Sequence, residues 1–345
     1  MAFYDSLKLE KGMYNSGFTK TLESIDPSEA YEGSDLAGLD AYERQLKRFN
    51  IKVKGQNSDI VDSFFQTTDS AVLFPEFVKR SVLMGMEAFN TLPSIVATVT
   101  NVENNDYRTI KSTTDSTAGN ATSETNELPK TVIQTKTSLV TMKKRGRIIA
   151  TSYEALRHKR LDLFAVTLRK IGADIARAQL GDAVDVLING DESGTAAAAV
   201  SPVSSSEIAY ADLVELWANL SGYELNTILA NTETMQALLA LSELKDAQTL
   251  LNFKGAGQVV TPLGATLHRV DAVADNTIVG FDKNCALEMV QVGDLIVDYD
   301  KLIDKQLERA TVSATAGFAK IFADSAKKMT YTTACLLYTS DAADE

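Results

Sequence analysis

The chain has 345 residues, of which 45% are hydrophobic, and its 46 acidic and 34 basic side chains give a formal net charge of −12. This length is sufficient for two domains with buried cores. The acidic balance argues against a protein that grips nucleic acid through phosphate contacts, but not against one that encloses it. No stretch approaches the roughly 20 apolar residues of a membrane span, and the first residues lack the pattern of a signal peptide.

The C-terminal segment CLLYTSDAADE, from Cys335 to Glu345, is expected to be the in-frame translation of a sequencing adapter, with the genuine reading frame cut at or near Ala334. Without it, 43 acidic and 34 basic residues leave a net charge of −9. Cys285 is then the single cysteine, so neither a disulfide nor a cysteine-based zinc site is expected. A hydrolase triad would have to use His158 or His268, the only two histidines.

The N-terminal region is predicted to be an arm. Residues 1–38 show little periodicity and indicate an extended or partly disordered segment. Apolar residues at helical spacing predict short helices over Leu39–Phe49, Asp59–Phe65 and Pro75–Phe89. Because these pieces lack a core of their own, we expect them to lie on something else; the alternative is a small helical cap on the same subunit.

A long two-stranded arm is predicted next. Strands are expected over Ser94–Val102, continued by Tyr107–Lys111, and over Thr131–Met142, whose apolar and polar residues alternate. Between them, Ser112–Asn126 is rich in Ser and Thr and forms a polar tip. A lone hairpin is marginal in water, so the arm should fold back on its own body or lie on a neighbour. A substrate lid or a disordered loop is the alternative.

Basic side chains gather at the foot of this arm: Lys143, Lys144, Arg145, Arg147, Arg157, Lys159 and Arg160. They are compatible with nucleic-acid contact. In an acidic chain, ion pairs with acidic surfaces of adjacent subunits, or simple solvation, are the favoured interpretation.

One long helix, Leu161–Ile188, organises the chain, because its apolar residues recur at steps of three and four. Its length would be roughly 40 Å. Thr151 and Glu154 have capping-box spacing and predict a short helical turn before it, and Asn189 and Gly190 are both suited to end it. An ordinary core helix of an α+β enzyme would show the same pattern.

The remaining chain predicts a linker, an α/β insertion and closing strands. The small-residue segment Asp191–Ser206 is the linker. The expected later elements are helices over Tyr210–Leu220 and Asn231–Leu244, capped by Asn231, and strands over Leu225–Ala230, Thr266–Val270, Thr277–Gly280, Ala286–Val292, Leu295–Tyr299 and Thr311–Phe322. Gly255–Gly257 does not follow a strand, which argues against dinucleotide binding. The irregular acids between Asp282 and Glu308 indicate a solvated surface more than a cation site.

This order of elements resembles the major capsid protein of tailed bacteriophages. The closest local matches are RIIATSYEALRH (Arg147–His158), INGDESGTA (Ile188–Ala196), NTILANTETMQALLAL (Asn226–Leu241) and the segment Thr277–Asp300. The resemblance covers Phe74–Tyr331 and implies an α+β fold of the Hong Kong 97 type. It implies these parts: an N-terminal arm with short helices over residues 1–93, an extended β loop over 94–142, a peripheral domain over 143–206 with its spine helix at 161–188, an axial domain over 207–289, and peripheral return strands over 290–334, with 335–345 left out as artefact.

The implied function is structural rather than enzymatic: subunits assemble through pentamers and hexamers into an icosahedral capsid that encloses double-stranded DNA without reading its sequence. The resemblance also implies possible partners: a scaffolding protein, a maturation protease, a portal and a decoration protein. It implies that the protein is made in the bacterial cytoplasm and ends in the virion. No catalytic residue, cofactor, metal or membrane contact is expected. Alternatives are an encapsulin-type compartment shell, a soluble hydrolase, or a tail or adaptor protein.

The expected subunit-interface residues lie in the arm and at its foot: Lys111, Thr117, Asn120, Glu124, Lys130, Lys136, Lys143, Lys144, Arg145 and Arg147. A Ser/Thr-rich tip can exchange hydrogen bonds with neighbours in several near-equivalent positions. One member of the fold cross-links its subunits through a lysine and an asparagine. None of the arm lysines can be aligned with that motif, so cross-linking is not predicted.

Overall fold

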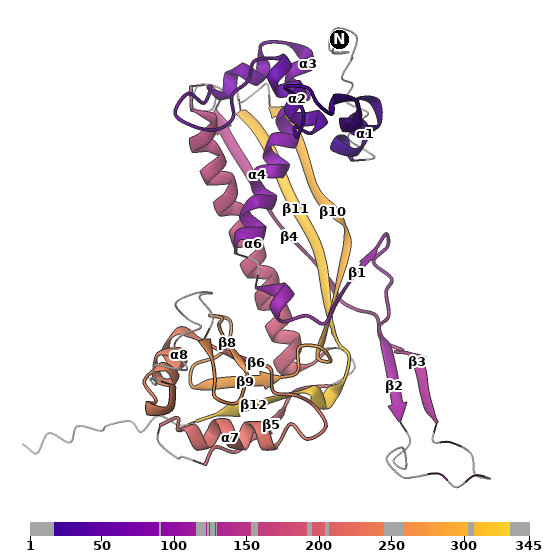
Figure 1. The fold of residues 1–345 in the computed structure, drawn as a ribbon, viewed down its shortest axis with the longest axis vertical. Coiled ribbons are helices and arrows are strands. Elements are labelled where there is room, and N and C mark those ends of the chain that lie inside the picture. The colour runs from indigo at the N-terminus through magenta and orange to yellow at the C-terminus, as the bar shows by residue number, and fades with distance from the viewer. Residues whose placement is uncertain are drawn as a thin grey trace, which may run out of the picture. The chain divides into compact units, whose positions relative to one another are not determined.

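The computed structural model describes residues 17–89, 91–114, 122, 124, 128, 130–152, 158–191, 195–203, 207–244, 259–302 and 307–331 (Figure 1). The chain divides into two compact units. Unit 1 comprises residues 1–90, 144–178 and 294–315, and unit 2 comprises residues 91–143, 179–293 and 316–345. The predicted names of extended loop, peripheral domain and axial domain remain proposals.

The N-terminal helices of unit 1 are folded onto their own chain. They are α1 (Phe18–Ile25), η3 (Ser28–Tyr31), α2 (Ala41–Arg48), η4 (Val61–Phe65), α3 (Thr68–Ala71) and α4 (Phe74–Ala88). Phe18 and Leu22 of α1 are buried in one cluster with Phe74, Leu168 and Val312. The prediction of an extended arm is therefore wrong for residues 17–38, and the alternative of a helical cap on the same subunit is the observed arrangement. Its apolar residues are sparse, but Phe18 and Leu22 lie in one core, whereas Ile25 is exposed.

The long helix α6 runs from Leu161 to Asn189, and the prediction of Leu161–Ile188 is confirmed. Gly190 follows it with a φ of 87°, the left-handed conformation that ends helices. Within unit 1, α4 crosses α6 closely, because β-carbons at Gly85 and Gly172 would overlap the backbone oxygens of Arg169 and Val82. Thr151, the residue predicted to open a short helical turn, lies at the end of strand β4 (Met142–Ser152), and the turn itself would fall in residues 153–157, outside the described part.

A four-stranded sheet has the order β1-β10-β11-β4, with β1 (Thr98–Val102), β10 (Leu287–Leu302) and β11 (Leu307–Lys320). β1 pairs in parallel with β10, and Thr98 lies opposite Glu288. The two strands predicted between Ala286 and Tyr299 are one continuous strand of 16 residues. Leu92–Ser94 forms a short 3₁₀ helix, so the first predicted strand starts later than expected.

The predicted arm contains a short two-stranded hairpin. β2 (Ile110–Thr114) pairs antiparallel with β3 (Thr131–Thr135). The expected strand Thr131–Met142 breaks after β3, because Lys136 and Val140 are buried against other parts of unit 2. We call the described residues 103–114 and 130–141, between β1 and β4, the loop segment.

A six-stranded sheet forms the rest of unit 2, in the order β5-β12-β9-β6-β8-β7. Its strands are β5 (Ala198–Val200), β6 (Thr227–Ala230), β7 (Val259–Val260), β8 (Thr266–Arg269), β9 (Thr277–Phe281) and β12 (Ala326–Thr330), packed with α7 (Tyr210–Ala218) and α8 (Thr232–Leu239). Asn231 caps α8 as predicted, accepting a hydrogen bond from the Thr234 amide at 2.8 Å. Sequence patterns missed β12, and the predicted linker Asp191–Ser206 contains β5, which pairs with β12.

Candidate assembly site

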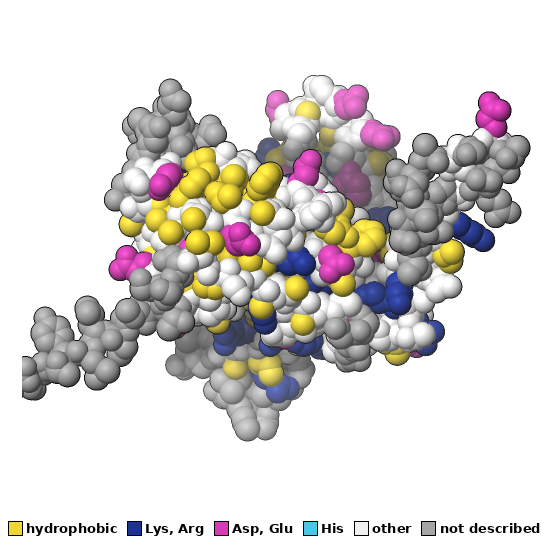
Figure 2. Space-filling model, turned by 90° about the horizontal axis from the view of Figure 1, so that it is seen from below, with side chains coloured by type: hydrophobic (Ala, Val, Ile, Leu, Met, Phe, Trp, Pro, Cys, Tyr) yellow, Lys and Arg dark blue, Asp and Glu magenta, His cyan; other side chains and the backbone are white. Residues whose placement is uncertain are grey.

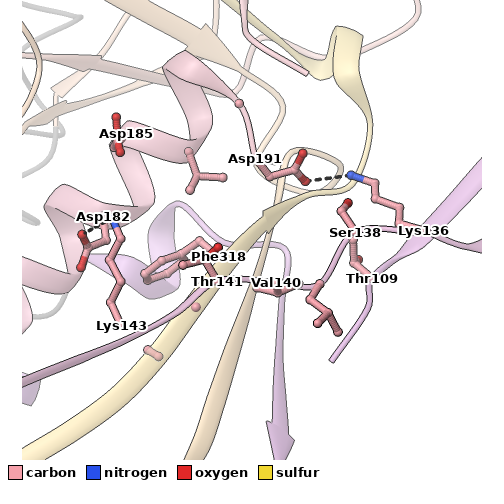
Figure 3. A pocket seen from close by; sticks show the side chains of 15 residues that line it. Thr109, Lys136, Ser138, Val140, Thr141, Lys143, Asp182, Asp185, Asp191 and Phe318 are labelled. Atoms are coloured by element: carbon pink, nitrogen blue, oxygen red, sulfur yellow. Dashed lines mark hydrogen bonds and ion pairs between the residues drawn. The ribbon is translucent and has the colours of Figure 1, made fainter. Parts of the chain in front are cut away.

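The loop segment is anchored to its own chain by a buried ion pair. Lys136 Nζ lies 2.8 Å from Asp191 Oδ2 and donates a second hydrogen bond to the carbonyl oxygen of Lys320 at 2.7 Å. Asp191 follows the end of α6, and its other oxygen accepts a hydrogen bond from Thr195 at 3.2 Å. Figure 3 shows Lys136 and Asp191 pointing toward one another. Because Lys136 is only 8% exposed, this pair fixes the base of the loop segment.

A second ion pair lies where the loop segment leads into β4. Lys143 Nζ is 3.0 Å from Asp182 Oδ1 on α6. The two anchors flank a hollow of about 220 Å³, whose lining includes Thr109, Ser138 and Phe318 (Figure 3). The Lys143 side chain is 42% exposed, so solvent screens this pair more than the Lys136 pair.

Glu288 of β10 forms a third anchor, with three hydroxyl donors. It accepts hydrogen bonds from Thr100 at 2.6 Å, from Tyr107 at 2.7 Å and from Thr109. Burial and the hydrogen bond to Glu288 raise the pKa of Tyr107. The Thr109 carbonyl accepts from the Lys136 amide at 2.8 Å, so this anchor is continuous with the first ion pair.

The hairpin beyond these anchors has an uncovered apolar face. The register places Ser112 opposite Ile133, so Ile110 and Ile133 lie on one face of the hairpin. Their side chains are 49% and 68% exposed, and all five residues of β3 are exposed. Val132, on the other face, is 37% exposed. A two-stranded ribbon with such a face lacks the packing that would stabilise it alone.

Two basic residues of β4 act on acids of α6 in the same chain: Lys143 forms the ion pair with Asp182, and Arg147 acts electrostatically on Asp174. Arg147 contributes to lowering the pKa of Asp174, which is lowered chiefly by the hydrogen bond from Lys170. Residues alternate across a strand, so Lys143 and Arg147 share one face of β4, and Ile148, on the other face, is 67% exposed.

Exposed hydrophobic side chains also occur beside the six-stranded sheet. Val214 and Trp217 of α7 are 38% and 53% exposed, and Val203 before α7 is 63% exposed. Figure 2 shows hydrophobic side chains gathered on the face seen from below, the side on which Figure 1 draws α7. An exposed Trp with apolar neighbours is typical of a protein contact surface.

A profile of the phage capsid protein family matches residues 135–324, more than half of the chain. The chain belongs to the phage capsid protein family. It is therefore a structural capsid subunit, and the predicted resemblance and function are confirmed at this level. No curated protein sequence is significantly similar to the chain.

Three solved structures share the fold of this capsid subunit. The capsid of a native GTA particle is 18% identical, with 70% of this chain and 90% of that chain covered and a TM-score of 0.52. A virus-like particle from Pyrococcus furiosus is 14% identical, with coverage of 74% and 98% and a TM-score of 0.51. A chain of the Microbacterium phage Oxtober96 structure is 12% identical, with 70% of this chain and 91% of that chain covered and a TM-score of 0.51. At these identities the likeness shows the fold alone, the α+β capsid fold of the Hong Kong 97 type that the sequence predicted.

The structure separates the predicted interface residues of the capsid subunit into groups. Those that are exposed are Lys111, Glu124, Lys130, Lys144 and Arg147, and Arg145 is partly exposed. Thr117 and Asn120 lie outside the described residues. Lys136 is buried in the ion pair with Asp191 of its own chain, so its place at a subunit interface stays a prediction. Lys143 also serves its own chain through Asp182.

Among the residues that the structure describes, neither histidine shares a hydrogen bond or ion pair with an acid or a nucleophile. His158 is exposed, and burial together with Lys283 lowers the pKa of His268, on β8. Within the described ranges, no group of three or more His, Cys, Asp or Glu side chains could hold a metal ion. In the same ranges, no helix is long and apolar enough to cross a membrane.

Sequence reasoning missed the acids that hold the loop segment: Asp182, Asp191 and Glu288. Asp191 stands in the segment INGDESGTA, which was noted only as the end of the long helix. Glu288 is the single charged residue of the predicted strand Ala286–Val292, and a buried charge in a mostly apolar strand requires partners. That signal could have marked Glu288, although it could not have named Thr100, Tyr107 and Thr109 as its donors.

Proposed function

We propose that this capsid subunit assembles through pentamers and hexamers into an icosahedral shell that encloses packaged double-stranded DNA, with its β2–β3 hairpin lying on a neighbouring subunit. The observation that carries the proposal is the hairpin face with Ile110 and Ile133, which is uncovered within the described part of the chain. Burying one isoleucine is worth about 1.5–3 kcal/mol, and a closed shell repeats each contact many times.

The same reasoning gives the other surfaces a role. Trp217 and Val214 would contact neighbouring copies of the six-stranded sheet region around the pentamer and hexamer centres. The exposed Lys111 and Lys130 would lie at the rim of the hairpin contact. The net charge of −9 without the segment Cys335–Glu345 suits an enclosed DNA that must move during packaging, because a strongly basic wall would hold it. A scaffolding protein, protease, portal and decoration protein are further proposed partners, the virion is the proposed location, and no enzymatic activity is proposed.

Assembly of the full chain tests the proposal, using light scattering after size exclusion and negative-stain electron microscopy. Closed particles or ring-shaped capsomers are expected. Replacing Ile110 and Ile133 together by Thr, which keeps the strand preference, should reduce particle yield at least tenfold. Val132→Thr on the opposite face is the matched control and should assemble like the wild type. A wild-type chain that stays monomeric even with a scaffolding protein, or equal loss in all variants, would contradict the hairpin contact.

The contents of the particle distinguish the proposal from an encapsulin-type shell, which the same fold also builds. Particles recovered from a producing culture should contain nuclease-protected double-stranded DNA. Particles filled with protein cargo and free of DNA would favour the compartment shell.

A further inference from the structure

The side chain of Lys320, in β11, is completely buried, with 0% of its surface exposed. Among the residues that the structure describes, its Nζ has no hydrogen-bond partner. Burial lowers the pKa of this lysine from 10.5 to about 8. Buried polar groups are nearly always paired, so an unpaired buried amine calls for an explanation.

Lys320 stands beside the carboxylate that anchors the loop segment. Its backbone N–H donates to Asp191 Oδ2 at 3.2 Å, and Asp191 is the principal charge that favours the protonated form of its side chain. The same oxygen lies 2.8 Å from Lys136 Nζ, which also bonds the Lys320 carbonyl at 2.7 Å. Two lysines therefore adjoin one acid, and Lys136 alone is paired with it. The other charges that act on Lys320 are Asp324, from η8 (Ala323–Ser325), Lys327 of β12, and Lys136 itself.

We propose that Asp191 is a shared acceptor, which exchanges Lys136 for Lys320 when the loop segment leaves its anchored position. Removing one partner of a buried ion pair normally leaves an uncompensated charge, which is strongly unfavourable. Lys320 can avoid this outcome, because its backbone N–H already donates to Asp191 Oδ2 at 3.2 Å and its flexible four-carbon side chain can turn the ammonium group toward the same carboxylate. The loop segment can then move while the core beneath it stays paired. The exchange takes place within one chain, so its test does not require assembled particles.

A double-mutant cycle on the full chain tests the exchange, with the equilibrium constant of urea unfolding as readout. Lys136→Met should change this constant less than tenfold, because Lys320 takes over Asp191. Lys320→Met should leave it unchanged or favour folding, since an unpaired buried charge is removed. The double variant should lose at least tenfold more than the product of the two single effects. Lys143→Met, which breaks the pair with Asp182, is the control and should combine with Lys320→Met without such an excess.

The pH dependence of stability is a second measurement, which needs only the Lys136→Met variant. Once Lys320 pairs with Asp191, its pKa should return toward the ordinary value, and the gain in stability between pH 8 and pH 10.5 expected for the wild type should shrink. Lys143→Met should retain that gain. The exchange would be overturned by multiplicative effects in the cycle or by failure of Lys136→Met to fold. It would also be overturned if Lys136→Met kept the full gain in stability between pH 8 and pH 10.5.

Discussion

Tyr107 donates its hydroxyl hydrogen bond to Glu288 Oε1 at 2.7 Å, although the two residues are 181 positions apart in the chain. This bond joins the start of the loop segment to β10. Thr100 and Thr109 donate to the same carboxylate, so Glu288 collects three hydroxyl groups while remaining only 6% exposed. A carboxylate can accept all three at once because it has about four lone-pair sites.

Glu288→Gln should therefore destabilise unit 2. The amide oxygen can replace part of this acceptor capacity, whereas the NH₂ group cannot accept a hydrogen bond and would face hydroxyl donors. We expect a loss of about 2–3 kcal/mol in the free energy of unfolding, and faster amide exchange in β1 and the loop segment. Tyr107→Phe removes a single donor and should cost about 1 kcal/mol. Equal stability of Glu288→Gln and wild type in urea unfolding would show that this anchor is not needed.

The close crossing of α4 and α6 in unit 1 gives a second prediction. A β-carbon at Gly172 would overlap the backbone oxygen of Val82, which cannot move as a flexible side chain could. Gly172→Ala should separate the helices and cost at least about 1–3 kcal/mol. Gly181→Ala, in the same helix, is the control, because its nearest neighbour would be Ala272 Cβ at 3.9 Å. That change should be neutral or stabilising by up to about 1 kcal/mol, as for glycine in a helix interior. Thermal unfolding of both variants measures the contrast, and similar shifts in the two would contradict it.

Buried Arg44 in α2 gives a third prediction, on the folded N-terminal cap. Its Nε lies 3.0 Å from Asp26 Oδ2, and its guanidinium also bonds Ser28 and the Leu39 carbonyl at 3.0 and 2.6 Å. Arg44→Met would leave Asp26, which is 5% exposed, without this partner. We expect a loss of about 3–5 kcal/mol and early proteolysis between α1 and α2.

The neighbouring Arg48 offers a matched control for Arg44. Its guanidinium lies 5.1 Å from the Phe49 ring and 3.5 Å from Gln45, and it is only partly buried. Arg48→Met should cost no more than about 1 kcal/mol. If Arg44→Met resists protease as well as Arg48→Met does, the cap is not held by this arginine.

Local patterns predicted the parts of the fold that depend on neighbours in sequence. The helix α6 was located to within one residue at its C-terminal end, because its apolar period repeats over its whole length. The cap at Asn231 was likewise predictable, since the residue type and its position before a helix suffice. A two-stranded hairpin was also expected, although its strands are shorter than the alternating pattern indicated.

Features decided by distant residues could not be predicted in this way. Lys136 reads as an exposed strand residue, and its burial depends on Asp191, 55 positions later. The polar composition of residues 17–38 concealed a core, because Phe18 and Leu22 find their partners on other helices. Strand β12 depends on β9 and β5, from two other regions of the chain, and its sequence AKKMT has little pattern of its own. In each case tertiary contacts override the local signal.

The titration of Lys320 gives a last prediction, on stability against pH. The folded chain releases this proton near pH 8, whereas the unfolded chain keeps it to about pH 10.5, the ordinary value. Between these values the unfolded state binds more protons, so the free energy of unfolding should rise with pH, by about 1.4 kcal/mol per unit and about 3 kcal/mol in total. Below pH 8 Lys320 is protonated in both the folded and the unfolded chain, so this stabilisation is absent. Lys320→Met lacks the group, so the difference between wild type and variant isolates its contribution from the tyrosines and Cys285 that titrate in the same range. Urea unfolding of both proteins from pH 7 to pH 10.5 should show the variant more stable at pH 7 and the gap closing as the pH rises. A gap that stays constant would mean that Lys320 keeps the same charge in the folded and unfolded chains.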